Sequence, residues 1–267
     1  MVHRVTEDAA RRPYHLYVPS AGGEGAPMFV AVHGLSRNVE EHARLFSGHC
    51  EANRAVLVAP LFAESHAADY QRLGRAGRGP RADALLDAVV GEVSRLTGAR
   101  AWPFHLFGFS GGAQFAHRYT MAHPHRVAHA VFAAAGWYTF PDPRERYPYG
   151  IRRTHDLPGV RFDPEEFLRV PMTVVIGDHD LAGEHMRDSP RLQRQQGRTR
   201  LERARKWVAA MRAAAQSYHI DSRVALDVIP GGDHSFLTLM QAHRLGERTF
   251  AALFGEGRRS VARNGNA

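Results

Sequence analysis

The chain has 267 residues, of which 44% are hydrophobic and 23% charged, a composition that excludes fibrous and wholly disordered proteins. This length fits one α/β domain with a single core. The only cysteine, Cys50, excludes an intramolecular disulfide and favours a reducing compartment. The sequence also lacks the paired cysteine and histidine spacing of a metal site, so we expect no bound metal.

The net charge is +8, and Lys206 is the only lysine. Such a charge can attract nucleic acid or anionic surfaces. The arginines are scattered among carboxylates, however, and no nucleic-acid recognition motif accompanies them. The densest cluster, residues 191–207, is typical of the solvated face of a helix. We therefore expect no nucleic-acid partner.

The N-terminal segment is too polar for the apolar part of a signal peptide. No later run reaches the roughly 18 apolar residues that a membrane span needs. We therefore expect a cytoplasmic protein with no membrane partner, although a secreted protein whose signal had been removed would look the same. A homo-oligomer is compatible with the sequence.

Short apolar or β-branched runs alternate with longer helix-like segments along most of the chain. The predicted strands are Tyr14–Val18, Met28–Val32, Ala55–Ala59, Phe104–Phe109, Val127–Ala134, Met172–Ile176 and Val224–Ile229. The predicted helices are Glu40–Asn53, Ala82–Leu96, Gly111–Ala122, Arg200–Tyr218 and Phe236–Phe254. The alternation predicts an α/β fold with a mostly parallel central sheet of about seven or eight strands and helices on both faces.

Two internal segments interrupt this alternation. Residues 137–169 are rich in proline and aromatic side chains and too long for a simple connection, so we expect a short cap or lid insertion there. Leu181–Thr199 is polar and predicted to be a long loop. The end of the chain is small, basic and glycine-containing. We predict one domain over residues 1–255, with the cap inside it, and a flexible tail over 256–267.

The run Gly108-Phe109-Ser110-Gly111-Gly112 lies where a predicted strand turns into a predicted helix. A serine on such a sharp turn adopts an unusual backbone conformation, which requires small neighbours. Its hydroxyl then projects above the sheet, and the N–H of Gly111 points toward the same space from a helix N-terminus. The G-x-S-x-G pattern alone is weak evidence in a chain with 25 glycines, where an ordinary glycine-rich turn is the alternative.

A serine nucleophile needs a base, which is usually a histidine oriented by a carboxylate. The segment "VVIGDHD" places Asp178 and Asp180 directly after one predicted strand, and "LDVIPGGDHSF" places His234 after the next. The carboxyl ends of parallel strands gather reactive groups at one edge of the sheet. We therefore predict that Ser110, one of the two aspartates and His234 act together. The alternative for His234 is a surface or hydrogen-bonded histidine without a catalytic role.

These motifs, together with "MFVAVHGL" at residues 28–35, resemble the α/β-hydrolase fold superfamily over nearly the whole chain. Near the serine, the chain is similar to the serine esterase branch that contains polyhydroxybutyrate-depolymerase-like and feruloyl-esterase-like proteins. The resemblance implies that Asp180, in a Gly-x-x-Asp turn, is the triad acid in preference to Asp178. It also implies that the N–H groups of Leu35 and Gly111 form the oxyanion hole, and that His33 is structural.

We therefore expect a serine hydrolase, carboxylesterase-like, that cleaves a carboxylic ester or thioester of a small molecule through an acyl-enzyme without metal or cofactor. Trp137 and Tyr138, where the cap begins, are expected to line the substrate pocket, with plain packing under a loop as the alternative. Cap arginines such as Arg146 either recognise a substrate carboxylate or stay solvated. Two further functions stay open: cleavage of an amide, lactone or carbon–carbon bond, and non-catalytic small-molecule binding.

Overall fold

The computed structural model describes residues 1–8, 11–181 and 186–264. Within these ranges the strands form one eight-stranded sheet in the order β1-β2-β4-β3-β5-β6-β7-β8. The strands are β1 Val2–Val5, β2 Pro13–Tyr17, β3 Met28–Val32, β4 Val56–Pro60, β5 Phe104–Phe109, β6 Val127–Ala133, β7 Met172–Gly177 and β8 Val224–Ile229. β2 pairs antiparallel with β1 and β4, and all other neighbours are parallel. The predicted fold class is confirmed.

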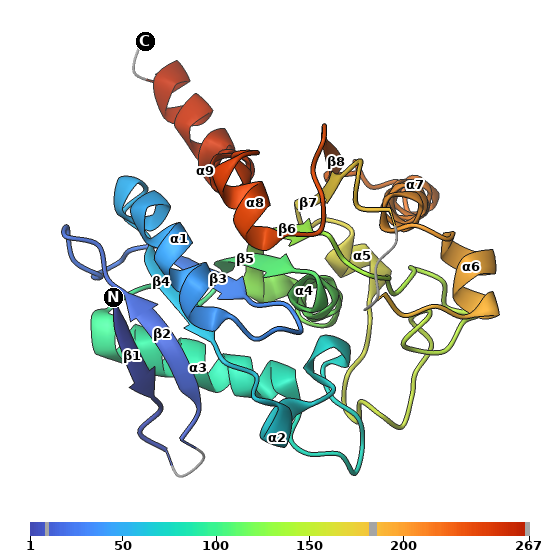
Figure 1. The fold of residues 1–267 in the computed structure, drawn as a ribbon, viewed down its shortest axis with the longest axis horizontal. Coiled ribbons are helices and arrows are strands. Elements are labelled where there is room, and N and C mark those ends of the chain that lie inside the picture. The colour runs from blue at the N-terminus through green and yellow to red at the C-terminus, as the bar shows by residue number, and fades with distance from the viewer. Residues whose placement is uncertain (9–10, 182–185, 265–267) are drawn as a thin grey trace.

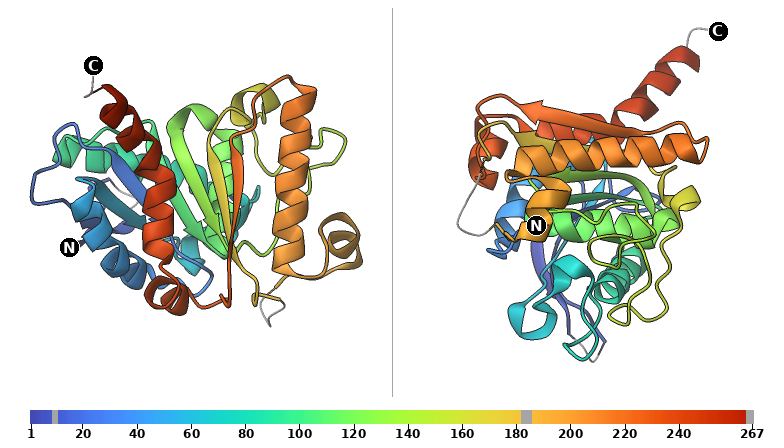
Figure 2. Two further views of the ribbon diagram at one scale, coloured as in Figure 1. Left: turned by 90° about the horizontal axis from the view of Figure 1, so that it is seen from above. Right: turned by 90° about the vertical axis from the view of Figure 1, so that its right-hand side faces the viewer.

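Helices cover both faces of this sheet (Figure 1, Figure 2). α1 (Val39–Ala52) and α9 (Leu245–Asn264) lie on one face, and α3 (Ala82–Thr97), α4 (Gly111–Ala122) and α7 (Arg200–Ser217) lie on the other. The shorter helices are α2 Glu64–Ala67, η1 Tyr70–Arg72, η2 Pro124–Arg126, α5 Pro164–Phe167, α6 Pro190–Gln196 and α8 Phe236–Gln241. Every residue of β3, β4 and β7 is buried, as expected for strands covered on both sides.

An aromatic cluster packs α1 and α9 against the central strands. The ring of Phe29 on β3 lies 5.1 Å from that of Phe46 on α1 and 4.8 Å from that of Phe250 on α9. Phe46 also contacts Phe107 of β5 at 4.8 Å between ring centroids. These contacts hold β3 and β5 rigidly in place, and the turns that follow these two strands carry Leu35 and Ser110.

The structure differs from the predicted elements in three places. α6 forms inside the predicted loop Leu181–Thr199, because Ser189 caps the helix by accepting a hydrogen bond from the N–H of Leu192, and a proline follows at the first helical position. The predicted helix Phe236–Phe254 is divided into α8 and α9, with Arg244 in the left-handed region at φ 59°. β1 was not predicted because its four residues are largely exposed and lack an apolar pattern.

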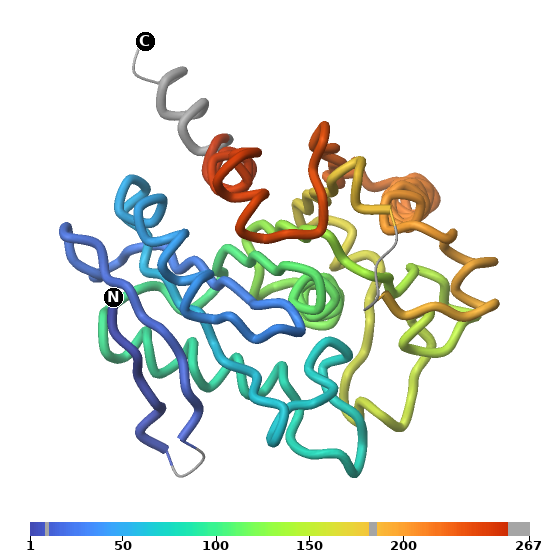
Figure 3. The backbone as a smooth tube through the Cα atoms, in the orientation of Figure 1, coloured from blue at the N-terminus to red at the C-terminus, as the bar shows by residue number. Residues whose placement is uncertain are grey.

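The segment predicted to be a cap runs beside α6 and α7 (Figure 3). The N–H of Tyr138 donates to Gln196 of α6, and the indole of Trp207 on α7 donates to the carbonyl of Thr139. At the other end of the chain, α9 continues to Asn264 through most of the predicted tail, and residues 265–267 lie outside the described residues. The division into domain, cap and tail stays a prediction.

No described helix is both long and apolar enough to cross a membrane. The described residues also contain no group of three or more histidine, cysteine, aspartate or glutamate side chains placed to hold a metal ion.

Buried histidines make the stability of this fold depend on pH. Burial lowers the pKa of His33 and His105 to about 4 and that of His42 to about 3. In the unfolded chain each pKa returns to about 6.5, so the unfolded state binds more protons below that pH. The free energy of unfolding should therefore fall as the pH drops from about 6.5 toward 4, by about 2 kcal/mol per histidine at pH 5.

Urea unfolding at pH 8, 6 and 5 measures this loss. A His105→Gln variant removes one titrating group away from Ser110 and should lose less stability than the wild type over the same range. A free energy of unfolding that stays constant between pH 8 and pH 5 would contradict the prediction.

Candidate active site

Ser110 sits on a tight turn between β5 and α4, with φ 52° and ψ −110°. Two glycines make this turn possible. A Cβ on Gly108 would lie 2.2 Å from the carbonyl oxygen of Gly112, and a Cβ on Gly112 would lie 2.2 Å from that of Val32. Strand and helix therefore pack so closely that neither position has room for a side chain, and Ser110 is held in a strained conformation.

The structure brings Ser110, His234 and Asp180 together from the ends of three strands. His234 Nε2 lies 3.0 Å from Ser110 Oγ, and His234 Nδ1 lies 2.7 Å from Asp180 Oδ2. Asp180 is 2% exposed, and His234 is half-buried. Asp178 lies apart from this chain of hydrogen bonds, because its Oδ1 accepts from the N–H of Gly231 at 2.7 Å.

Backbone contacts between the turns after β7 and β8 set this geometry. The N–H of His179 donates to the carbonyl of Gly232 at 3.0 Å, and that of Asp178 donates to Ile229 at 3.1 Å. A Cβ on Gly177 would lie 2.0 Å from the carbonyl oxygen of Gly232. The two turns are thus locked together, which places Asp180 beside His234.

Sequence reasoning missed a second partner of Asp180. Arg200 Nη1 donates to Asp180 Oδ1 at 2.8 Å, and the two side chains are 3% and 1% exposed. The carboxylate is therefore held by His234 on one oxygen and by a buried guanidinium on the other. Arg200 and Arg203 belong to the cluster that we expected to be solvated, but both are buried, so that expectation is wrong for these two residues. The missed signal is their helical spacing, because Arg200 and Arg203 share one face of α7 with the buried Ala204, Trp207 and Met211.

The two N–H groups expected to form an oxyanion hole lie beside Ser110. Within the described part of the chain, neither the N–H of Leu35 nor that of Gly111 donates a hydrogen bond to another group. A Cβ on Gly111 would come within 3.1 Å of the Leu35 side chain, so the two residues are neighbours. His33 is fully buried, and its Nε2 accepts from the N–H of Phe62 at 3.0 Å, which fits a structural role.

A cavity of about 370 Å³ opens beside Ser110. It is lined by Gly34, Leu35, Ser36, Asn38, Glu41, His42, Phe109, Ser110, His234, Ser235, Phe236 and Leu237. Trp137 and Tyr138 are not among these lining residues. Tyr138 is fully buried, with its ring stacked 5.0 Å from that of Trp207, and Trp137 lies 4.2 Å below the guanidinium of Arg118. Their part in substrate binding stays a prediction.

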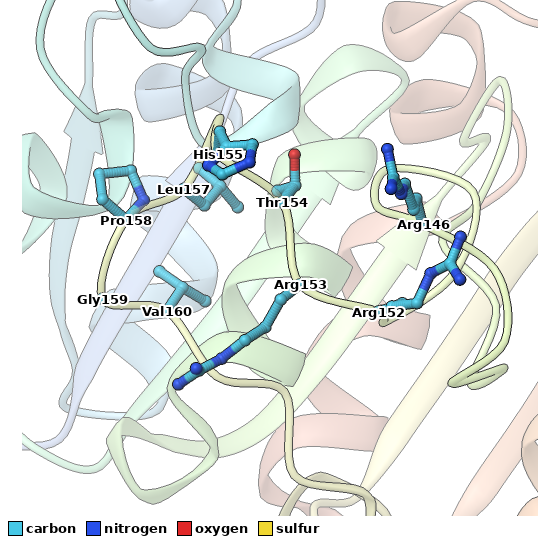
Figure 4. A pocket seen from close by; sticks show the side chains of 9 residues that line it. All are labelled: Arg146, Arg152, Arg153, Thr154, His155, Leu157, Pro158, Gly159 and Val160. Atoms are coloured by element: carbon cyan, nitrogen blue, oxygen red, sulfur yellow. The ribbon is translucent and has the colours of Figure 1, made fainter.

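Arginines of the predicted cap line a different pocket of about 490 Å³ (Figure 4). Arg146, Arg152 and Arg153 are exposed around it. This pocket shares no lining residue with the cavity beside Ser110. The cap arginines therefore belong to a solvated surface outside that cavity.

The close packing at this turn predicts that a side chain at position 112 lowers the stability of the fold. Gly112→Ala places a methyl group 2.2 Å from the carbonyl oxygen of Val32, so strand and helix must separate, and we expect a loss of about 1–3 kcal/mol of unfolding free energy. Gly91, inside α3, has no atom within 4 Å of its would-be Cβ. Gly91→Ala is the matched control and should gain up to about 1 kcal/mol. Urea unfolding tests both variants, and equal midpoints for the two would contradict the prediction.

No family model and no curated protein matches this chain. Several solved structures are similar to it. Poly(aspartic acid) hydrolase-1 from Sphingomonas sp. KT-1 has a TM-score of 0.78 at 24% identity, with 91% of this chain and 97% of that chain covered. The poly(3-hydroxybutyrate) depolymerase LpqC from Bordetella parapertussis has a TM-score of 0.73 at 28% identity, with 91% and 90% covered. The fluorophosphonate-binding serine hydrolase FphF from Staphylococcus aureus has a TM-score of 0.60 at 12% identity, with 94% and 96% covered.

These neighbours confirm the resemblance that the motifs indicated. They share the mostly parallel sheet and its covering helices over nine-tenths of this chain. They also support the prediction that this chain is a hydrolase. The chain therefore has the α/β-hydrolase fold, and its solved neighbours include members of the esterase branch.

Proposed function

We propose that this protein is a serine hydrolase that cleaves a carboxylic ester or thioester of a small molecule through an acyl-enzyme. The observation that carries the proposal is the run of hydrogen bonds from Ser110 Oγ through His234 to Asp180, next to a cavity. This arrangement activates a hydroxyl that is otherwise a poor nucleophile. The neighbour at 28% identity is named for depolymerising a polyester, which supports an ester as the bond cleaved. The single cysteine supports a cytoplasmic location.

In the first half of the reaction, Ser110 Oγ forms a bond to the substrate carbonyl carbon while its proton passes to His234 Nε2. Asp180 accepts the hydrogen bond from His234 Nδ1–H and stabilises the imidazolium. The N–H groups of Leu35 and Gly111 bind the oxyanion. The bond to the leaving group then breaks, and the leaving alcohol or thiol takes the proton from His234.

In the second half, water takes the place of the leaving group. His234 accepts a proton from that water as its oxygen attacks the acyl carbonyl. The new tetrahedral intermediate is held by the same two N–H groups and collapses as Ser110 Oγ leaves with the proton from His234. The products are a carboxylic acid and the free enzyme. Every step uses side chains and backbone groups of this chain.

Ser110→Ala removes the nucleophile and should lower kcat for p-nitrophenyl butyrate by about a millionfold. Folding should be unaffected, which circular dichroism and urea unfolding verify. In the wild type, a fluorophosphonate probe should label Ser110, as located by mass spectrometry. A loss of activity below tenfold, or an adduct on another residue, would overturn the assignment.

A panel of esters, amides and β-diketones then identifies the bond that the wild type cleaves. Faster cleavage of amides than of esters would replace the ester in this proposal.

Arg200 should support this activity by positioning Asp180. Arg200→Gln removes the charged donor to Asp180 Oδ1, so the carboxylate is held less firmly against His234. The variant should lose about 10–100-fold in kcat with little change in KM. Arg200→Lys keeps the charge and is the matched control, with a smaller loss. Steady-state kinetics with p-nitrophenyl butyrate test this, and equal losses in the two variants would contradict it.

A further inference from the structure

Arg118 is a buried cation without a counter-ion. Its side chain on α4 is fully buried, and it donates only to neutral acceptors: Thr139 Oγ1 and the carbonyl oxygens of Gln71 and Gln114. Its Nη2 has no partner. No carboxylate of the described residues pairs with it. Burial of an unpaired charge is costly, so a group that completes this site is expected to carry negative charge.

Burial lowers the pKa of Arg118 to about 10, which still leaves the guanidinium charged at neutral pH. The site therefore presents a positive charge under the conditions in which a hydrolase works. A planar guanidinium with a free N–H matches the geometry of a carboxylate.

Two other arginines gather around the same indole. The guanidinium carbons of Arg118, Arg72 and Arg187 lie 4.2, 5.6 and 5.4 Å from the ring centre of Trp137. We call Arg118, Arg72 and Arg187 the Trp137 arginines. Among the described residues, none of the three forms an ion pair with a carboxylate. Arg187 is exposed and Arg72 is half-buried, so positive charge extends from solvent to the buried Arg118. A cluster of like charges around one ring is stabilised when an anion binds among them.

Arg118 lies on the helix whose N-terminus carries Ser110. Ser110, Gln114 and Arg118 follow one another at intervals of four along one face of α4. Helical side chains lean toward the N-terminus, and Arg118 Nη1 reaches the carbonyl oxygen of Gln114 at 3.4 Å. The Arg118 Cα lies about 12 Å along the helix axis from Ser110, and its side chain extends back toward that residue.

The surroundings of this turn are polar. Gln114 Oε1 and Gln71 Oε1 are both buried without a hydrogen-bond partner. Because unpaired buried polar atoms disfavour an alkyl chain beside them, they fit a polar substrate better than a fatty acyl group. The polar groups beside Arg118 are buried, whereas the three arginines of the cap pocket in Figure 4 are exposed.

We propose that the Trp137 arginines bind a carboxylate of the substrate, so that the preferred substrates are esters of acids with a second, free carboxylate about a glutaryl chain away from the scissile carbonyl. This inference rests on the proposed function and specifies its substrate class. Arg118 binds the carboxylate through Nη2, and Arg72 and Arg187 attract it from solvent.

The test compares two substrates of nearly the same shape, the mono-p-nitrophenyl ester of glutaric acid and its methyl ester, which lacks the charge. Wild-type kcat/KM should favour the charged substrate by at least tenfold. Arg118→Gln should lower kcat/KM for the charged substrate by about 10–100-fold and leave the neutral one unchanged. Arg72→Gln should lose several-fold of the preference. Arg146→Gln, in the cap pocket, is the matched control and should keep the full preference.

If Arg118→Gln does not fold, the Arg72→Gln variant still decides the result, because its guanidinium makes no hydrogen bond to another described residue. Calorimetric binding of glutarate to Ser110→Ala requires no turnover and should weaken at least tenfold when Arg118→Gln is added. Inorganic phosphate should compete poorly with glutarate.

The outcomes separate the two proposals. Turnover of the neutral ester without preference for the charged one overturns the carboxylate site and leaves the serine hydrolase standing. Binding of glutarate that depends on Arg118, without turnover of either ester, supports the carboxylate site and overturns the hydrolase. An equal loss of preference in Arg146→Gln, or equal competition by phosphate, reduces the effect to general charge attraction and overturns the site.

Discussion

The close approach of backbone at Gly108 and Gly112 is the constraint on which the site depends. Neither position has space for a Cβ, so the first turn of α4 lies directly against β3 and β5. This contact forces Ser110 to φ 52° and directs its side chain toward the turn after β8. Gly111 is the first residue of α4, so its N–H has no partner within the helix. The proposed nucleophile and one proposed oxyanion donor therefore lie at the same tight turn.

The second constraint is electrostatic. A carboxylate as buried as Asp180 has lost its water, and it is compensated by one bond to His234 and one to Arg200. Since each oxygen has its own donor, the carboxylate cannot rotate without breaking a charge-assisted bond. The imidazole that depends on it is consequently fixed in orientation. The rings of His42 and Phe236, stacked with their centroids 3.7 Å apart, also line the cavity.

The order of strands and helices was predictable because apolar runs of the right length are separated by turn residues, and β3 to β8 were found within one or two residues. The three hydrogen-bonded side chains were placed because each follows a strand of a parallel sheet. Asp180 and Asp178 could not be separated on spacing alone, since both follow β7. The burial of Arg200 could have been found from its place on the apolar face of α7, but its pairing with Asp180 could not, because the two residues belong to separate elements. The burial of Arg118 was not predictable, because arginine is usually solvated.

The structure shows that the buried arginines differ in whether a carboxylate compensates their charge. Arg200 is neutralised by Asp180, whereas Arg118 reaches only neutral oxygens. Arg118 thus leaves a positive potential in a low-dielectric region beside α4, where it is less screened than a surface charge. The helix dipole adds to this potential at the N-terminal turn that carries Ser110. In the proposed mechanism, a negatively charged substrate would be attracted along the same helix whose N-terminus would stabilise the oxyanion, so one element would serve both binding and chemistry.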